Sequence, residues 1–295
     1  MLTLEVTKIG SSTFTRRDGR WSDLIETAKQ EPEYWPSERA SQTANHKKFT
    51  GTNTFEEAIK LAEDGWPEGR AKFADMAGVA SYQIGHRRPG TGYDVGGRYP
   101  NVPRFCAGDP ASMVTSDPRN DTQRHIVTIY VACCASWSVS TDTILHRGAA
   151  IGGLIDAVED EGHSVRLVVF ENNKAYQFPA WYEIEVKSAG EPLDLDLMAF
   201  AVTHPAVLRR LVFSVHEQNG HIGEGGFHDT YIHGYGSVGN GWPTKRVGER
   251  PHGALFFDSL IGNPGHFASI EAAAKFVASE WETRIAEDAS LQDAA

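Results

Sequence analysis

The chain has 295 residues, of which 40% are hydrophobic and 23% charged, and it carries a net charge of −11 at pH 7. This composition is typical of a globular protein with one large domain or two ordinary ones. The acidic balance disfavours nucleic-acid binding by the whole surface. No apolar run reaches the roughly 18 residues that a bilayer requires, and the first residues lack the basic and apolar regions of a secretory signal. We therefore predict a soluble, cytoplasmic protein without a membrane partner.

Three cysteines occur, Cys106, Cys133 and Cys134. An odd count with two neighbours gives no disulfide framework, and no CxxC spacing is present for zinc or redox exchange. Because Cys133 and Cys134 lie in an apolar run, we interpret them as buried reduced thiols.

The first part of the chain, residues 1–118, is predicted to be mainly helical. It begins with an alternating strand pattern over 2–9. Helical spacing or capping signals follow over 19–30, 52–66 and 67–84, with Pro67 well placed to begin the last of these helices. Much of the positive charge lies in this part, which leaves open a basic face.

Residues 85–118 are rich in glycine and proline but also carry aromatic and aliphatic side chains. We predict an ordered loop that packs on the surface of the next domain. Aromatic residues stand here beside arginines, an arrangement that can stack on bases or clamp a partner peptide. The alternative is that Arg and Asp pair with each other to hold the loop. The binding candidates are Asp94, Arg98, Arg104 and Asp109.

The second part, residues 119–295, alternates between strand and helix patterns. Apolar strands are predicted over 124–135, 164–170 and 253–260, a half-exposed edge strand over 181–188, and a strand around 211–215. Helices are predicted over 141–162, within 191–220, and over 269–287 with Ser269 as cap. This rhythm predicts an α/β fold with a mostly parallel central sheet and helices on both faces.

The order of strand, serine-rich loop, helix, glycine and strand over 124–170 is similar to the opening of a von Willebrand A domain, as also found in Ro-type RNA-binding proteins. In such domains the first strand ends in an Asp-x-Ser-x-Ser loop that binds magnesium. Both serines match here, as Ser136 and Ser138, but Cys134 stands at the aspartate position. A thiol is a poor ligand for a hard cation. We therefore expect a degenerate metal site and no cofactor, with magnesium as the alternative that the resemblance implies.

Three blocks, 49–69, 93–114 and 189–217, resemble an uncharacterised family of proteins found largely in tailed bacteriophages. This resemblance implies a phage origin, and hence the host cytoplasm, but carries over no activity.

Two further sets of polar residues each allow two interpretations. His216, His221, His228 and His233 lie close in sequence and offer nitrogen ligands for a transition metal, although no HExxH pattern is met and glycines surround them. They can equally be surface or turn histidines. Asp258 follows the last strand, where a sheet of this type places its ligands, or it caps the loop behind that strand.

The function predicted from these patterns is non-enzymatic: a binding or adaptor protein that recognises a protein partner, such as an AAA-type ATPase, through the edge of the sheet. The first alternative is a nucleic-acid-binding accessory factor for phage replication or transcription. The second is a metal-dependent hydrolase that uses the histidines, and the third is a component of the virion.

Overall fold

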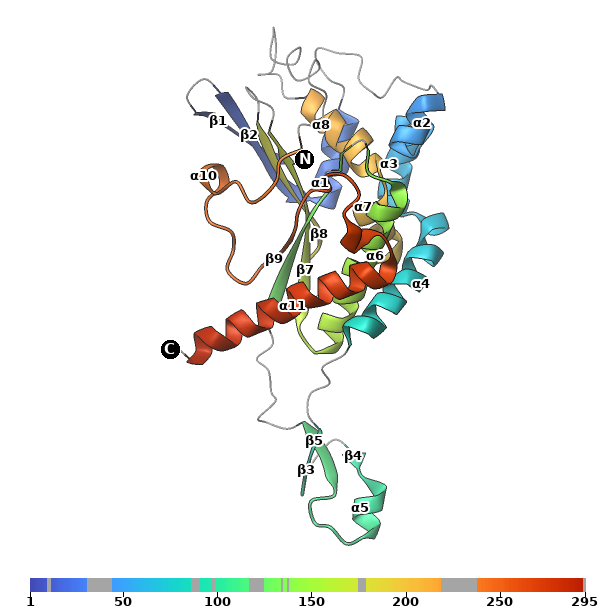
Figure 1. Cartoon of the computed structure of the whole chain (residues 1–295), viewed down its shortest axis with the longest axis vertical. Coiled ribbons are helices and arrows are strands. Elements are labelled where there is room, and N and C mark those ends of the chain that lie inside the picture. The colour runs from blue at the N-terminus through green and yellow to red at the C-terminus, as the bar shows by residue number, and fades with distance from the viewer. Residues whose placement is uncertain are drawn as a thin grey trace.

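The computed structural model describes residues 1–9, 12–30, 44–85, 91–96, 99–116, 125–133, 135–136, 138–174, 179–218 and 238–293. Its centre is a six-stranded sheet with the order β1-β2-β8-β7-β6-β9 (Figure 1). The strands are β1 Thr3–Ile9, β2 Ser12–Arg20, β6 Ile126–Ala132, β7 Ser164–Asn173, β8 Ala180–Lys187 and β9 Leu255–Phe257.

The sheet is mixed and mostly parallel. β6 runs parallel to both of its neighbours, β7 and β9, and β2 runs parallel to β8. β1 with β2 and β7 with β8 are antiparallel. The prediction that the apolar run after residue 124 forms a central strand of a mostly parallel sheet is confirmed.

Two predictions about strands are wrong. β8 is a central strand between β2 and β7, not an edge strand. Its alternation arises because Glu183 and Glu185 pair with arginines of the flanking strands, Arg16 on β2 and Arg166 on β7. The segment around residues 211–215 is helical, because a π-helix continues there directly into an α-helix.

The described helices lie mainly on one face of the sheet (Figure 1). Their buried residues join one large hydrophobic cluster with β-strand residues such as Val131, Val169 and Ile184. The sequence predicted helices on both faces of the sheet, whereas most of the described helices pack on one face. The helices of this layer are α1 Trp21–Lys29, α2 Ala44–Thr50, α3 Phe55–Asp64, α4 Pro67–Ile84, α6 Thr141–Asp160, α7 Leu195–Thr203, η3 Val207–Val212, α8 Phe213–Glu217, η5 Gly265–Phe267 and α11 Ile270–Asp293.

The opposite face carries an aromatic layer. The ring of Phe170 stacks on those of Trp181 and Phe256, each at a centroid distance of 4.8 Å. Trp242 covers them from outside and meets Trp181 edge-on at 5.0 Å. The helix α10 (Thr244–Val247) follows Trp242, so the stretch after residue 238 closes this face.

Small residues set the distance between α6 and its neighbours. α6 begins where the Ser140 side chain accepts a hydrogen bond from the Thr143 amide at 3.1 Å, as a helix cap does. Further along, a Cβ atom at Gly153 would lie 2.6 Å from the carbonyl oxygen of Ala77 on α4. Glycine therefore permits the backbones of α4 and α6 to touch.

Residues 91–116 form a separate small sheet with the order β3-β5-β4, which we call the projecting module. Its elements are β3 Thr91–Asp94, β4 Tyr99–Pro100, α5 Val102–Cys106 and β5 Met113–Ser116. Figure 1 shows it standing away from the body, below the ends of α4 and β6. The sequence predicted an ordered loop packed on the next domain, whereas the described residues of this region form short strands and a short helix. The short strands bond to each other and form their own sheet.

The sheet and its core include residues from both sides of the boundary predicted at residue 118. β1 and β2 extend the sheet through β8, and α1, α3 and α4 contribute to the same cluster as α6 and α11. The first part thus supplies two strands of the six-stranded sheet besides its helices. Within the described residues no single helix is long and apolar enough to cross a bilayer. Two consecutive helical segments, Leu195–Thr203 and Val207–Glu217, reach that length and hydropathy only together, and they are bent by 69° relative to each other.

Candidate binding site

The serine loop after β6 lies at the carboxyl edge of the sheet. Ala135 forms a parallel bridge with Leu260, and the Ser136 amide donates to the Leu260 carbonyl at 2.8 Å. Because β6 and β9 are parallel, the segments that follow them meet at the same edge. The hydroxyl oxygens of Ser136 and Ser138 lie 3.3 Å apart, within hydrogen-bond distance. Cys134, between β6 and this loop, lies outside the described residues.

Asp258 follows β9 and holds loop backbone. One carboxylate oxygen accepts from the Gly241 amide at 2.6 Å, and the other accepts from the Ser259 amide at 2.7 Å. Its carbonyl oxygen accepts from Arg147 at 3.1 Å. This geometry corresponds to the interpretation of Asp258 as a loop cap.

The residues at this edge do not fit the magnesium site that the resemblance implies. The hydroxyl groups of Ser136 and Ser138 bond to each other, and the Asp258 carboxylate is engaged with two amides. In the part of the chain that the structure describes, no three His, Cys, Asp or Glu side chains are grouped to hold a metal ion.

The candidates in the projecting module bond within the module. Arg104 donates through Nε to Asp109 at 2.8 Å, and its guanidinium lies 4.1 Å from the ring centroid of Tyr93. The hydrogen bond from Arg104, together with one from the Ala111 amide, holds the pKa of Asp109 below its usual value. Asp94 accepts from the Val95 amide at 2.6 Å. Arg104 and Asp109 thus pair with each other inside the module, as one of the two interpretations held. Arg98 lies outside the described residues.

The surface of the module is apolar at several points. Tyr93 is 40% exposed, Val95 74%, Val102 62% and Phe105 68%. Apart from residues 1–9, where Met1, Leu4, Val6 and Ile9 are exposed, no other short stretch of the described chain carries as many exposed large hydrophobic residues. The module therefore presents apolar groups to solvent while its own charges are paired.

His216 on α8 is part of a buried network, not of a surface cluster. Its Nε2 lies 2.6 Å and 2.8 Å from the two carboxylate oxygens of Glu171 on β7, and its Nδ1 lies 2.9 Å from the hydroxyl of Tyr182 on β8. Both ring nitrogens are thus engaged inside the core. His221, His228 and His233 lie outside the described residues, so the structure does not bring the four histidines together.

A profile described as "Domain of unknown function (DUF7192)" matches residues 13–264. The chain belongs to this family. No curated protein and no solved structure gives a significant match. The match to DUF7192 begins inside β2 and ends beyond β9, so the family unit includes most of the sheet and the projecting module.

The sequence predictions for this DUF7192 chain missed several buried polar residues. Glu171 ends the apolar run of β7, and Arg209 and Arg210 interrupt the apolar run of η3. All three are less than a tenth exposed. These residues could have been found as charged residues within apolar runs. If such a run is buried, its charged residue must have a polar partner in the core.

Proposed function

We propose that this protein is a non-enzymatic binding or adaptor protein that recognises a protein partner through the projecting module. The observation that carries the proposal is the exposure of Tyr93, Val95, Val102 and Phe105 on one small module. Exposed apolar groups gathered on a single feature are typical of interaction sites. Aromatic residues such as Phe105 are also enriched in protein interfaces.

The carboxyl edge of the sheet is a second contact region in this proposal. Ser138 is exposed there and Ser136 is partly so. The succession of β6, serine loop, α6 and β7 supports a von Willebrand A-like interpretation, and with it an AAA-type ATPase as the partner. The three sequence blocks that resemble tailed-phage proteins support a phage origin.

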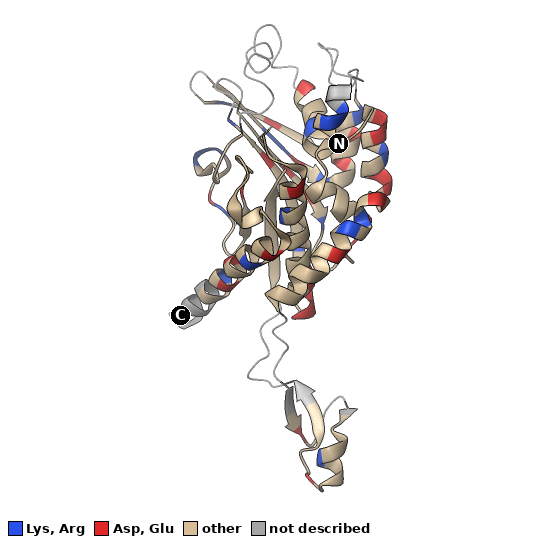
Figure 2. Ribbon diagram, turned by 45° about the vertical axis from the view of Figure 1, so that its right-hand side comes forward, with Lys and Arg blue, Asp and Glu red and all other residues tan. Residues whose placement is uncertain are grey.

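A protein partner suits the charges of the described surface better than nucleic acid does. Arg104 pairs with Asp109 in the module, and on α4 Arg70 and Lys72 lie within ion-pair distance of Asp196 and Asp142. Figure 2 shows acidic and basic residues interspersed along the helical side and few charges on the module. Binding to nucleic acid needs basic side chains that can take the place of the counterions around its phosphates.

The test compares partner capture by three full-length tagged chains: the wild type, the double variant V95S/F105S, and the control Y82S. Tyr82 is 86% exposed on α4, outside the module. We expect the wild type and Y82S to retain the same protein from host cells that express the native partner, and V95S/F105S to lose it. Equal capture by all three chains would remove the module from the proposal.

Partner binding should survive EDTA, because the edge residues do not match a magnesium site. Loss of the partner in EDTA, with recovery in magnesium, would contradict this expectation.

A second experiment titrates the purified protein with single-stranded DNA and RNA over a salt series. Salt-dependent binding of either nucleic acid, unchanged in V95S/F105S, would favour a nucleic-acid-binding accessory factor instead.

A further inference from the structure

Arg209 on η3 carries a buried charge without a carboxylate partner among the described residues. Its side chain is 7% exposed. Nη1 donates to the Phe49 carbonyl at 2.6 Å, and the guanidinium lies 4.1 Å from the Phe49 ring centroid. Nη2 is buried and has no hydrogen-bond partner in the described part of the chain.

A buried charge of this kind is unfavourable unless it is paired. Burial lowers the pKa of Arg209, but a guanidinium remains protonated in proteins near neutral pH. A carbonyl oxygen and an aromatic face stabilise the group without neutralising it. The positive charge and the free Nη2 donor therefore call for an anion.

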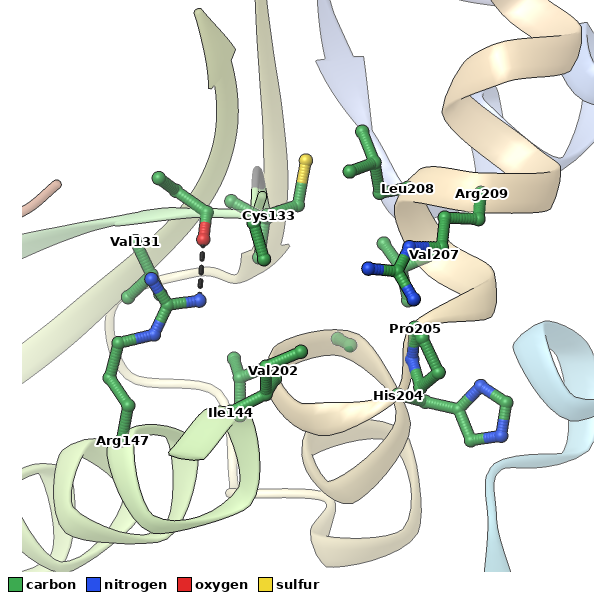
Figure 3. Close-up of a pocket in the computed structure, with 14 residues that line it drawn as sticks. Val131, Cys133, Ile144, Arg147, Val202, His204, Pro205, Val207, Leu208 and Arg209 are labelled. Atoms are coloured by element: carbon green, nitrogen blue, oxygen red, sulfur yellow. Dashed lines mark hydrogen bonds between the residues drawn. The ribbon is translucent and has the colours of Figure 1, made fainter. Parts of the chain in front are cut away.

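Arg209 borders a cavity that is positive from two sides. Arg209 and Arg147 line it from η3 and α6, and Cys133 lines it at the end of β6 (Figure 3). Arg147 is 1% exposed and donates to the carbonyl oxygens of Ala132 at 2.7 Å and Asp258 at 3.1 Å. The remaining lining is largely apolar: Val131, Val202, Val207 and Leu208 among others.

The backbone around Arg209 is also unusual. η3 is a π-helix over Val207–Val212, and π-turns occur frequently at functional sites. In this wide turn the two consecutive residues Arg209 and Arg210 are both buried. The cavity thus lies between an irregular helix and the carboxyl end of the central strand β6, on the edge that holds Asp258.

We propose that this cavity binds one small monovalent anion, a chloride ion or a single carboxylate group, as the counter-ion of Arg209. The cavity measures about 20 Å³, which is space for about one water-sized particle. This size favours a compact anion over a phosphate or a nucleotide. Two guanidinium groups disfavour a metal cation.

The test measures the melting temperature of the full chain at constant pH and ionic strength while sodium gluconate, a bulky salt, is replaced by sodium chloride or sodium acetate. A ligand that binds only the folded state stabilises it, so we expect the wild type to gain about 2–4 °C with saturation. R209M should lose this gain. The control R70M, which removes a 53% exposed guanidinium paired with Asp196, should keep it.

The outcomes separate the two sources of the anion. A gain with chloride alone identifies a free ion, and a gain with acetate identifies a carboxylate site. Equal responses of the wild type and R209M would overturn the proposal, because general salt effects act on both. If R209M does not fold, the wild type decides by itself: a saturating dependence on the anion supports the site, and a linear dependence without saturation overturns it.

Discussion

His204 lies directly after α7, and its ring is packed between two aromatic side chains. It stacks on Phe200 at 4.9 Å and meets Trp66 edge-on at 4.8 Å, and its Nδ1 accepts from the Ala206 amide at 3.1 Å. Burial lowers the pKa of His204 from 6.5 to about 4. The folded protein therefore holds this ring neutral under conditions in which the unfolded chain protonates it.

The lowered pKa of His204 predicts that the free energy of unfolding decreases as the pH falls. The unfolded state binds the proton first, so the contribution of His204 is present in full above pH 6.5 and is lost as the pH falls from 6.5 towards 4. Between pH 7 and pH 5 this loss amounts to about 2 kcal/mol of unfolding free energy. Urea unfolding at both pH values measures it.

The matched variant is H204N, whose amide oxygen can replace Nδ1 as acceptor but does not titrate. We expect H204N to lose about 2 kcal/mol less than the wild type between the two pH values. Parallel losses in both proteins would show that His204 is not the group responsible.

At the scale of elements, the contact between α4 and α6 depends on glycine. A methyl group at Gly153 would lie 2.6 Å from backbone atoms of Ala77 and Ser81, whereas at Gly78 on α4 it would meet nothing within 4 Å. G153A should therefore lower the free energy of unfolding by about 1–3 kcal/mol through overpacking. G78A should raise it by up to about 1 kcal/mol through helix propensity. Denaturant unfolding of both variants tests this, and similar effects of the two substitutions would contradict the close approach.

Local signals predicted several elements well. The start of α11 after Ser269 follows from capping, since this cap involves residues only three positions apart. The position of β8 in the sheet did not follow, because its alternating pattern is also that of an edge strand. Only Arg16 and Arg166 on its two neighbours explain why its glutamates lie inside the sheet.

The candidate site was predicted in part for a related reason. Arg104 and Asp109 are five residues apart, so their pairing could be proposed from the sequence as one of two interpretations. The contacts of Arg209 with Phe49 and of His216 with Glu171 join residues far apart in the chain. No local pattern indicates such partners.

At the scale of the whole molecule, the projecting module and the body are separate in their packing. Neither hydrophobic cluster of the body includes a described residue between 85 and 125. Replacing residues 86–124 with a flexible glycine-serine linker should therefore leave the cooperative unfolding of the body in place while partner capture is lost. Circular dichroism with thermal unfolding, beside the capture assay, measures both. Loss of folding would show that the body depends on the module.

The sequence by itself determined where the main helices and the central strand lie, because hydrophobic periodicity, caps and glycine or proline breaks act over a few residues. It also indicated that residues 85–118 differ in character from their surroundings. Only the tertiary structure decided that β2 joins β8 in the sheet, that the helices gather mainly on one face, and that Arg209 borders a cavity. These features depend on contacts between distant segments, whose free energy depends on burial and pairing in the folded chain rather than on local spacing.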